Sequence, residues 1–300
     1  MTGNAEDVIM DTAREEFLCR NAIYKELACE VEAILKGLLK SEKLKAVNVI
    51  SRVKDVDGFL EKIHRKKYDR PFEQMTDIVG TRVVCLYTED QNKIGKMIDS
   101  VFKVLDIDDK VLELGIDRMG YHDISYVAIL KDEQSNLNKY KFEIQVRTIM
   151  ADAVSIIAHD LSYKKEPPLP KELEREVNLI FSTMELVQYH CDALRNRREK
   201  YVVDITNMAD DEKNQMLFFN EPITDDSLRV YTKKLHPDLP IKENIHSLIL
   251  RDLNPSRYRV LGDIDKAVKA AKEFIEHYKR KSESFKAGSD YISKSLGYCD

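Results

Sequence analysis

A β-rich run near the middle of the chain carries polar side chains at alternating positions. In the segment YKFEIQVRT, alternation places four polar residues on one face of a strand, namely Lys141, Glu143, Gln145 and Arg147. The other face is apolar and consists of Phe142, Ile144 and Val146. One carboxylate between basic neighbours is suited to the floor of a polyanion site that holds a metal. The alternative is a solvated outer face of an antiparallel strand.

The segment that follows, TIMADAVSIIAHDLSYKK, is typical of a largely apolar helix with one narrow polar stripe. Asp152, Ser155 and His159 form this stripe at helical spacing. A helix that is apolar nearly all round is buried, so its polar side chains need partners. His159 is interpreted either as a satisfied core histidine or as a structural hydrogen-bonding group at the edge of a site.

Upstream of these segments, five cations occur within fifteen residues, and they are Arg52, Lys54, Lys62, Arg65 and Lys66. Phe59 and Ile63 are expected to anchor the opposite side of the same helix. Such a cluster suits a triphosphate. The alternative is a solvated basic face.

Asp77 stands just ahead of the strong strand GTRVVCLY, which contains Arg82. If Asp77 meets Glu143 from another strand, the two carboxylates provide the arrangement that Mg²⁺ with a nucleotide phosphate requires. The sequence contains neither GxxxxGK[ST] nor GxGxxG, so no P-loop or dinucleotide fold is indicated. Tyr121, directly after Gly120, is a candidate for stacking on a nucleobase, with ordinary packing as the alternative.

The spacing of apolar residues predicts the helices and strands that position these side chains. Residues 11–40 predict a helix or helix pair with a break near Asn21, and strands are expected within 47–53, 80–87, 125–130 and 140–148. The stretch EDQNKIGKMIDSVFKVL between them is expected to be helical. Strands mixed with helices in this order predict an α+β domain with a mixed sheet flanked by helices.

The second half of the chain is expected to be helical. After the stiff segment EPPLP, residues 171–201 contain no helix breaker, and apolar side chains recur at steps of four and three from Leu173 to Leu194. This seam is interpreted as packing against the chain's own core, with a helix–helix dimer contact as the alternative. Residues 202–225 are expected to be irregular, and 226–300 to form a helical extension in which Asp263 or Asp265 caps a helix.

Composition excludes several classes of protein. The 300 residues have a net charge of −5, which argues against a generally basic protein that coats nucleic acid. No stretch is apolar enough to span a membrane and the N-terminus lacks the features of a signal peptide, so a cytoplasmic location is expected. Five scattered cysteines without a CxxC pair predict free buried thiols rather than disulfides or a zinc site.

Four of these segments also occur in the order and spacing of a known family. SRVK…K (52–62), TDIVGTRVVCLYTED (76–90), GYHDISYV (120–127) and FEIQVRT…AHDLSYK (142–164) resemble the RelA/SpoT-type alarmone synthetase domain. The resemblance covers roughly residues 50–164. Within the family, the chain resembles the small synthetases that lack a hydrolase. Predicted segments are therefore N-terminal helices (1–44), the synthetase domain (45–165), a long helix (171–201) and a helical extension (226–300).

The resemblance implies a nucleotidyltransferase-like fold and transfer of pyrophosphate from ATP to the ribose 3′-hydroxyl of GDP or GTP. It assigns ATP binding to Arg52, Lys54 and Lys62, with Arg65 from the same basic run. It assigns acceptor binding to Tyr121, His122, Gln145 and Arg147. Asp77 and Glu143 are the implied Mg²⁺ ligands and catalytic residues, Glu143 also activating the attacking hydroxyl.

The sequence departs from the family pattern at several positions. Gly58 stands where the family has a serine, and in the acceptor loop Asp123 replaces a serine and Ser125 a histidine. Asp117 occupies the place of a frequent lysine, and Asp152 begins the DAV that replaces HAW. An acid near an anionic acceptor is electrostatically unfavourable. Donor-side residues thus match the family better than acceptor-side residues.

The altered acceptor side leaves two alternative functions open. One is a toxin-like enzyme that transfers pyrophosphate to the 3′ end of tRNA, whose backbone the basic stretches 195–200 and 277–286 could hold; solvated helix ends are the other interpretation of those stretches. A catalytically inactive nucleotide-binding regulator is the second alternative. No hydrolase activity is expected, because the residues that precede Arg52 include no histidine. Family resemblance and the seam also permit a homo-oligomer.

Overall fold

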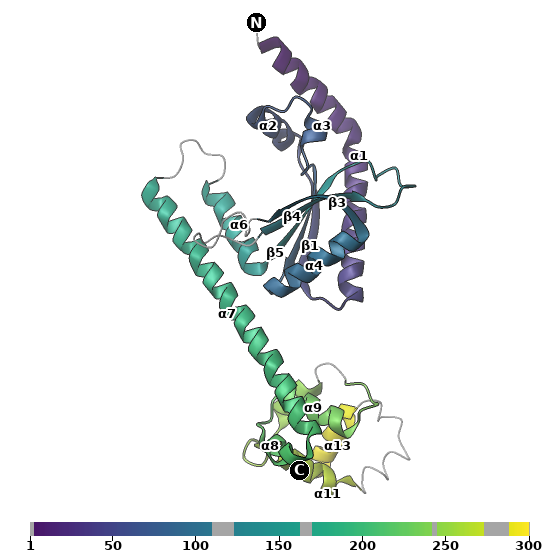
Figure 1. Cartoon of the computed structure of the whole chain (residues 1–300), viewed down its shortest axis with the longest axis vertical. Coiled ribbons are helices and arrows are strands. Elements are labelled where there is room, and N and C mark those ends of the chain that lie inside the picture. Colours follow the sequence, from purple (N-terminus) through teal and green to yellow (C-terminus); the bar gives the residue numbers. More distant parts are fainter. Residues whose placement is uncertain (1–2, 110–122, 163–169, 242–244, 273–287, 300) are drawn as a thin grey trace. The chain divides into compact units, whose positions relative to one another are not determined.

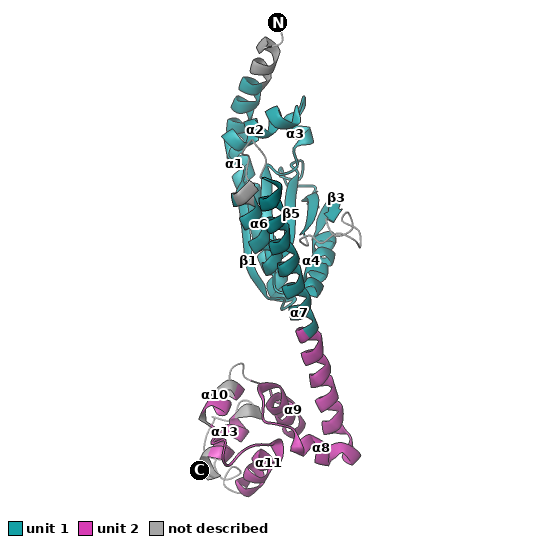
Figure 2. Ribbon diagram, turned by 90° about the vertical axis from the view of Figure 1, so that its left-hand side faces the viewer, with its two compact units in different colours: residues 1–193 teal, residues 194–300 magenta. Residues whose placement is uncertain are grey.

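The computed structural model describes residues 3–109, 123–162, 170–241, 245–272 and 288–299 (Figure 1). Within these ranges the chain divides into two compact units, residues 1–193 and 194–300, with the division inside one long helix (Figure 2). The first unit contains every described residue to which the sequence assigned a catalytic, metal-binding or nucleotide-binding role.

A five-stranded mixed sheet forms the centre of the first unit, in the order β1-β2-β5-β4-β3. Its strands are β1 (Ala46–Val53), β2 (Val79–Cys85), β3 (Phe102–Asp109), β4 (Asp123–Leu130) and β5 (Phe142–Thr148). β2 and β5 are parallel, and the other neighbouring pairs are antiparallel. The predicted α+β class with a mixed sheet flanked by helices is confirmed. On the polar face of β5, Glu143 and Gln145 are partly buried and Arg147 is buried, so this face is not an ordinary solvated face.

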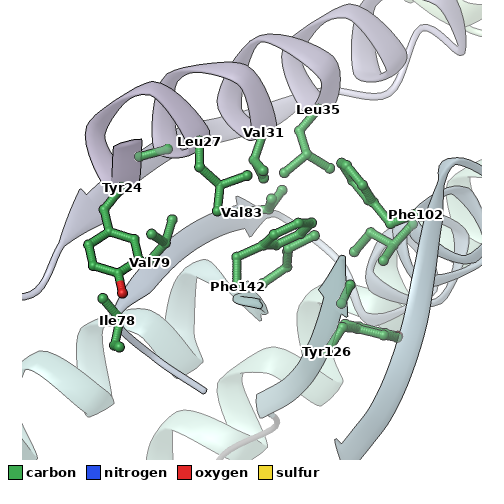
Figure 3. Packing of buried hydrophobic residues seen from close by; sticks show 14 of the residues in the cluster. Tyr24, Leu27, Val31, Leu35, Ile78, Val79, Val83, Phe102, Tyr126 and Phe142 are labelled. Atoms are coloured by element: carbon green, nitrogen blue, oxygen red, sulfur yellow. The ribbon is translucent and has the colours of Figure 1, made fainter. Parts of the chain in front are cut away.

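Helices bury the apolar face of the sheet. α1 (Gly3–Ser41) is one continuous helix that contacts β1 and β2, and α4 (Thr88–Val101) packs against β2, β3 and β5. Side chains at helical spacing on α1 meet alternating strand residues in this core (Figure 3), among them Tyr24, Leu27, Val31, Leu35, Val79, Val83 and Phe142. The alternation predicted for β5 is confirmed, since Phe142, Ile144 and Val146 are fully buried.

One strand is missing from the expected set. The predicted helical stretch that ends at Leu105 divides into α4 and the edge strand β3, which begins at Phe102 and pairs with β4. Phe102 is buried and Val104 packs on the core while Lys103 is exposed, so the period changes from helical to alternating at this point. The helix prediction for residues 102–105 is therefore wrong.

Two short helices connect β1 to β2. α2 (Val56–Lys66) starts at Asp55, whose carboxylate accepts a hydrogen bond of 2.7 Å from the backbone N–H of Gly58. Phe59 and Ile63 are its buried residues, as the sequence predicts, and this leaves the basic residues on other faces. α3 (Pro71–Gln74) begins with a proline at its first position, where no intrahelical N–H is needed.

The long helix is longer than expected. α6 (Ile149–Ser162) follows β5, and α7 runs from Lys171 to Asp210 rather than ending near 201. Ile205 and Ala209, four residues apart, are almost fully buried and continue the helical pattern. A 3₁₀ turn (Glu212–Asn214) and α8 (Gln215–Asn220) come next, so the irregular conformation predicted for 202–225 is wrong for most of that stretch.

The apolar seam on α7 does not pack as predicted. Four of its residues are 37–62% exposed, and these are Leu173, Ile180, Val187 and Leu194. The helix instead contacts the sheet unit through polar side chains. Gln188 donates to the carbonyl of Leu86 at 3.1 Å, and Thr88 donates to Asp192 at 2.7 Å.

The second unit is helical and has its own apolar core. It contains the last part of α7 and all of α8. Four further described helices follow, and these are α9 (Asp225–Leu235), α10 (Ile245–Asp252), α11 (Leu261–Ala270) and α13 (Gly288–Cys299). Asp263 stabilises the start of α11 by accepting from the backbone N–H groups of Arg259 and Val260, as one of the two predicted caps.

The described cysteines form no disulfides. Cys19, Cys29, Cys85 and Cys191 are free, but Cys19 and Cys29 are exposed on α1, so the prediction of buried thiols is wrong for these two. A search of the described helices finds none that combines the length and the apolar character needed to cross a membrane.

Candidate active site

The polar face of the sheet gathers the candidate residues because β5 lies between β2 and β4. Strand register places Glu143 opposite Gly80 of β2, and Gln145 opposite Arg82. On the other side, Asp123 of β4 lies opposite Arg147. Residues two apart share a face, so these side chains form adjacent rows on the side of the sheet away from α1.

A pocket of about 210 Å³ lies over this face. We call it the front pocket, and the charged and amide side chains that line it are Asn48, Arg52, Asp77, Arg82, Glu143, Gln145 and Asp152. Three strands and the start of α6 contribute these residues, together with the segment that precedes β2. Asp77 and Glu143, which the sequence predicts to meet, both line this one pocket.

Two lysines hold the Asp77 carboxylate in what we call the pocket cluster (Lys54, Lys62 and Asp77). The Nζ atoms of Lys54 and Lys62 lie 2.9 and 2.8 Å from its two oxygens. Burial raises the pKa of Asp77, but the hydrogen bonds and charges of the two lysines outweigh it, so the pKa lies below its ordinary value. Asp77 is therefore ionised at neutral pH.

Local structure explains why these three residues meet. The backbone N–H of Lys54 donates to the carbonyl of Ile78 at 2.9 Å, which joins the end of β1 to the residue after Asp77. Lys62 reaches the same carboxylate from α2, which Phe59 and Ile63 anchor in the core. The cap and the buried side chains of α2 position Lys62, and the backbone hydrogen bond positions Lys54. Both lysines therefore contact the Asp77 carboxylate.

Glu143 lies beside this cluster in a different environment. The Gln145 amide donates to Glu143 Oε1 at 2.6 Å, along the same strand face. Burial raises the pKa of Glu143, and the negative charges of Asp77 and Asp123 add to the effect. A carboxylate whose pKa is raised accepts a proton more readily, so Glu143 is suited to general-base chemistry.

Arg147 belongs to a second group, which we call the sealed cluster (Asp123, Arg147 and Ser155). Its guanidinium donates to Asp123 Oδ2 at 2.7 Å and to Ser155 Oγ at 2.7 Å. The Arg147 and Asp123 side chains are only 6% and 8% exposed. Arg147, which the sequence assigned to the acceptor, is not among the residues that line the front pocket. The Asp123 carboxylate thus forms an ion pair with a guanidinium inside the protein.

The structure adds two pocket residues that the assigned set omitted. Arg82 lies 3.1 Å from Asp152 through its NH1 atom, and both side chains line the front pocket. Arg82 is two residues after Gly80 and therefore lies on the same face of β2, opposite Gln145. The sequence could have indicated Arg82 as a pocket residue once that face of β2 was known to line the pocket. Asp152 and Ser155 belong to the polar stripe predicted for α6, and both find arginine partners there.

Of the other residues that the sequence singled out, one lines the front pocket, one lies away from it and three have side chains outside the described residues. Arg52 is exposed and lines the front pocket. Arg65 lies near the end of α2, 3.9 Å from Glu61, and does not line that pocket. Tyr121 and His122 lie outside the described residues, as does the side chain of His159.

The acidic residues present suit a metal that is shared with a phosphate. No group of three or more His, Cys, Asp or Glu side chains within the described ranges is arranged to hold a metal ion. Mg²⁺ is commonly bound through one or two carboxylates together with substrate phosphates. Asp77 and Glu143 line one pocket, and the cations Lys54 and Lys62 lie on Asp77, so these residues fit that pattern.

Part of the chain is similar to known proteins. Residues 51–167 match the family model described as the region found in RelA / SpoT proteins. The chain is 28% identical over 160 residues to GTP pyrophosphokinase YjbM of Bacillus subtilis (strain 168), covering 50% of this chain and 75% of that protein. GTP pyrophosphokinase YwaC of the same organism is 25% identical over 134 residues, 42% of this chain and 63% of that protein.

Solved structures agree with this assignment. The crystal structure of small alarmone synthetase 1 from Bacillus subtilis superimposes with a TM-score of 0.54 at 25% identity, covering 62% of this chain and 97% of that chain. The same synthetase bound to its product pppGpp gives a TM-score of 0.52 at 26% identity, covering 61% and 96%.

Proposed function

Because this chain carries a RelA/SpoT-type synthetase domain, we propose that it transfers pyrophosphate from ATP to the 3′-hydroxyl of GDP or GTP and so produces an alarmone. The proposal is supported above all by the front pocket, where Asp77 and Glu143 meet beside Lys54, Lys62 and Arg52. Names of the similar proteins point to the same activity.

In the proposed reaction the 3′-oxygen of the acceptor attacks the β-phosphorus of ATP, while its proton passes to a carboxylate oxygen of Glu143. The bond between the β-phosphorus and the α,β-bridging oxygen breaks, and AMP leaves with that electron pair. The raised pKa of Glu143 suits it to receive the proton. Gln145, which donates to Glu143 Oε1, orients the carboxylate.

Lys54 and Lys62 are placed to exchange partners during binding. Both pair with Asp77, and their side chains are 16% and 21% exposed. When ATP phosphates enter, the lysines can contact the added negative charge and release Asp77 oxygens. Asp77 and Glu143 would then hold Mg²⁺ with the phosphates, and the metal supplies charge neutralisation on the transferred group. Arg52 and Arg82 are the cations left to contact the rest of the donor nucleotide.

A transfer assay tests this proposal directly. The purified chain is incubated with Mg²⁺ and γ-labelled ATP, with GDP, GTP, ADP or bulk tRNA offered separately and Glu143→Gln as the control. We expect label on GDP or GTP, and none with the variant. Label on tRNA alone would assign the alternative, tRNA-modifying activity. ATP binding without transfer to any acceptor would refute the proposed activity for the isolated chain.

A further inference from the structure

The sheet unit contains a second hollow, larger than the front pocket. Its volume is about 620 Å³, and none of its lining residues lines the front pocket. The N-terminal half of α1, α3 and the turn between β4 and β5 form its walls. We call it the rear pocket. Small-molecule sites commonly measure about 300–1,000 Å³, so it has the capacity of a ligand site.

Aromatic rings and cations line the rear pocket together. Phe72 and Tyr140 are partly buried, and Tyr24 lies edge-on to Tyr140 with ring centroids 5.6 Å apart. The Arg20 guanidinium lies 4.6 Å from the centre of the Phe72 ring, and Lys139 Nζ lies 5.4 Å from that of Tyr140. Rings with cations beside them provide both stacking surface and charge for an aromatic anion.

The charge of the pocket is positive. Four cations line it, Arg20, Arg70, Lys139 and Lys141, against the two carboxylates of Glu16 and Glu73, a net charge of +2. Arg20 pairs with Glu16, and Arg70 with Glu73 at 2.8 Å. Lys139 and Lys141 are both exposed, and Lys141 donates to the backbone carbonyl of Glu73 at 3.1 Å. Both lysines are thus available to an added phosphate.

Two short segments connect the rear pocket to the catalytic carboxylates. Met75 and Ile78 line the rear pocket and are 2% and 4% exposed, whereas Asp77 between them lines the front pocket. Figure 3 shows Ile78 beside Tyr24 at one end of the buried cluster. The Ile78 carbonyl also accepts from the Lys54 backbone. Lys141, directly before β5, lines the rear pocket two residues before Glu143.

From this arrangement we propose that the rear pocket binds a nucleoside phosphate, with the base against Phe72 and Tyr140 and the phosphates on Arg70, Lys139 and Lys141. Its occupancy changes the position of Asp77 and Glu143 through segments 75–78 and 141–143. The binding part stands on the rear pocket alone, whereas the effect on turnover rests on the proposed function.

Equilibrium dialysis with labelled GDP tests the binding. Three forms are compared: wild type, the rear-pocket variant Arg70→Ala/Lys139→Ala, and the control Lys96→Ala/Lys103→Ala, which removes two exposed cations outside both pockets. We expect the rear-pocket variant to bind one GDP fewer per chain than the other two forms. Equal stoichiometry in all three would refute the site. Urea midpoints of the three forms establish that each is folded.

Competition and kinetics complete the test. Inorganic pyrophosphate should displace the rear-pocket GDP at least tenfold less effectively than unlabelled GDP; equal displacement would overturn the nucleoside part of the proposal. Transfer rates against GDP concentration should deviate at least twofold from a single hyperbola in wild type and control, but not in the rear-pocket variant. A single hyperbola in all three would overturn the coupling. If no form transfers pyrophosphate, the proposed function fails while the dialysis result still decides the site.

Discussion

The pocket cluster and the sealed cluster contain the same kind of bond but differ in access to solvent. Lys54 and Asp77 are joined at 2.9 Å with side chains 16% and 22% exposed, whereas Arg147 and Asp123 are joined at 2.7 Å with 6% and 8% exposed. Contact distance therefore does not distinguish an ion pair that is open to a pocket from one that is sealed inside the protein. An ion pair open to a pocket can exchange a partner for a ligand, and a sealed pair cannot do so without leaving a buried charge.

The largest effect is expected at Glu143, beside the pocket cluster. Glu143→Gln removes the proton acceptor while keeping the shape of the side chain, so the transfer rate should fall by about 10³-fold. Stability should change little, because a neutral amide tolerates burial that already raises the pKa of Glu143. Rapid-quench transfer and urea unfolding measure the two quantities.

Glu133→Gln is the matched control, since Glu133 is exposed in the turn after β4. It should retain the wild-type rate. A Glu143→Gln protein that turned over within tenfold of wild type would remove Glu143 from the chemistry. It would also leave the pocket cluster without a base.

The sealed cluster should show the reverse pattern, a loss of stability. Asp123→Asn leaves the Arg147 charge buried with fewer partners, and breaking a buried pair costs about 3–5 kcal/mol of unfolding free energy. We expect about 3 kcal/mol, because Ser155 and the nearby Asp152 still contact Arg147. Urea denaturation at pH 7 measures this cost.

Glu73→Gln breaks an exposed pair of similar length as a control. Arg70 and Glu73 lie 2.8 Å apart with both side chains 67% exposed. The expected loss is below about 0.5 kcal/mol. Equal losses for Asp123→Asn and Glu73→Gln would show that burial does not separate the two kinds of ion pair.

Most of the sheet could be predicted from the sequence because its central strands alternate strongly. YKFEIQVRT has one apolar and one polar face, and burial follows that alternation. β3 was missed since FKVLDIDD follows directly on an amphipathic helix with no glycine or proline between them. The end of α7 was also missed, because the apolar residues that extend it belong to a core formed by later helices.

The residue types of the candidate site could be predicted from the sequence, but the contacts between their side chains could not. Asp77, Glu143, Lys54 and Lys62 are recognisable by residue type and spacing. That Arg147 would be buried against Asp123 depends on the register between β4 and β5, which no local pattern specifies. Asp123 would be electrostatically unfavourable beside an anionic acceptor but is favourable beside the Arg147 guanidinium. The effect of this substitution therefore depends on which group lies next to it.

Acceptor recognition should therefore depend on Tyr121 rather than on Arg147. Tyr121→Ala removes the expected stacking on the acceptor base, and loss of one such contact corresponds to about 1–3 kcal/mol. The KM for the acceptor should rise at least about tenfold while the KM for ATP stays within twofold. Tyr121→Phe keeps the ring and should restore acceptor binding. An equal rise in both KM values would contradict the stacking role.

The smallest effect is expected in the pH dependence of stability at Asp77. Its pKa in the folded chain lies below the ordinary value of 3.8, so its stabilising contribution is present above that pH and is lost as the pH falls through the folded-state pKa. Asp77→Asn should cost about 1 kcal/mol at pH 7, as for a partly exposed ion pair, and less at pH 3. Urea unfolding at both pH values measures the difference.

Glu143 provides the internal contrast, because its pKa is raised rather than lowered. Its contribution is present below the ordinary value of 4.5 and is lost as the pH rises through the folded-state pKa. Glu143→Gln should therefore be relatively more stable than wild type at pH 7 than at pH 3, opposite in sign to Asp77→Asn. If both variants shifted in the same direction, the two carboxylates would share one environment, and the division of roles between a paired acid and a base would fail.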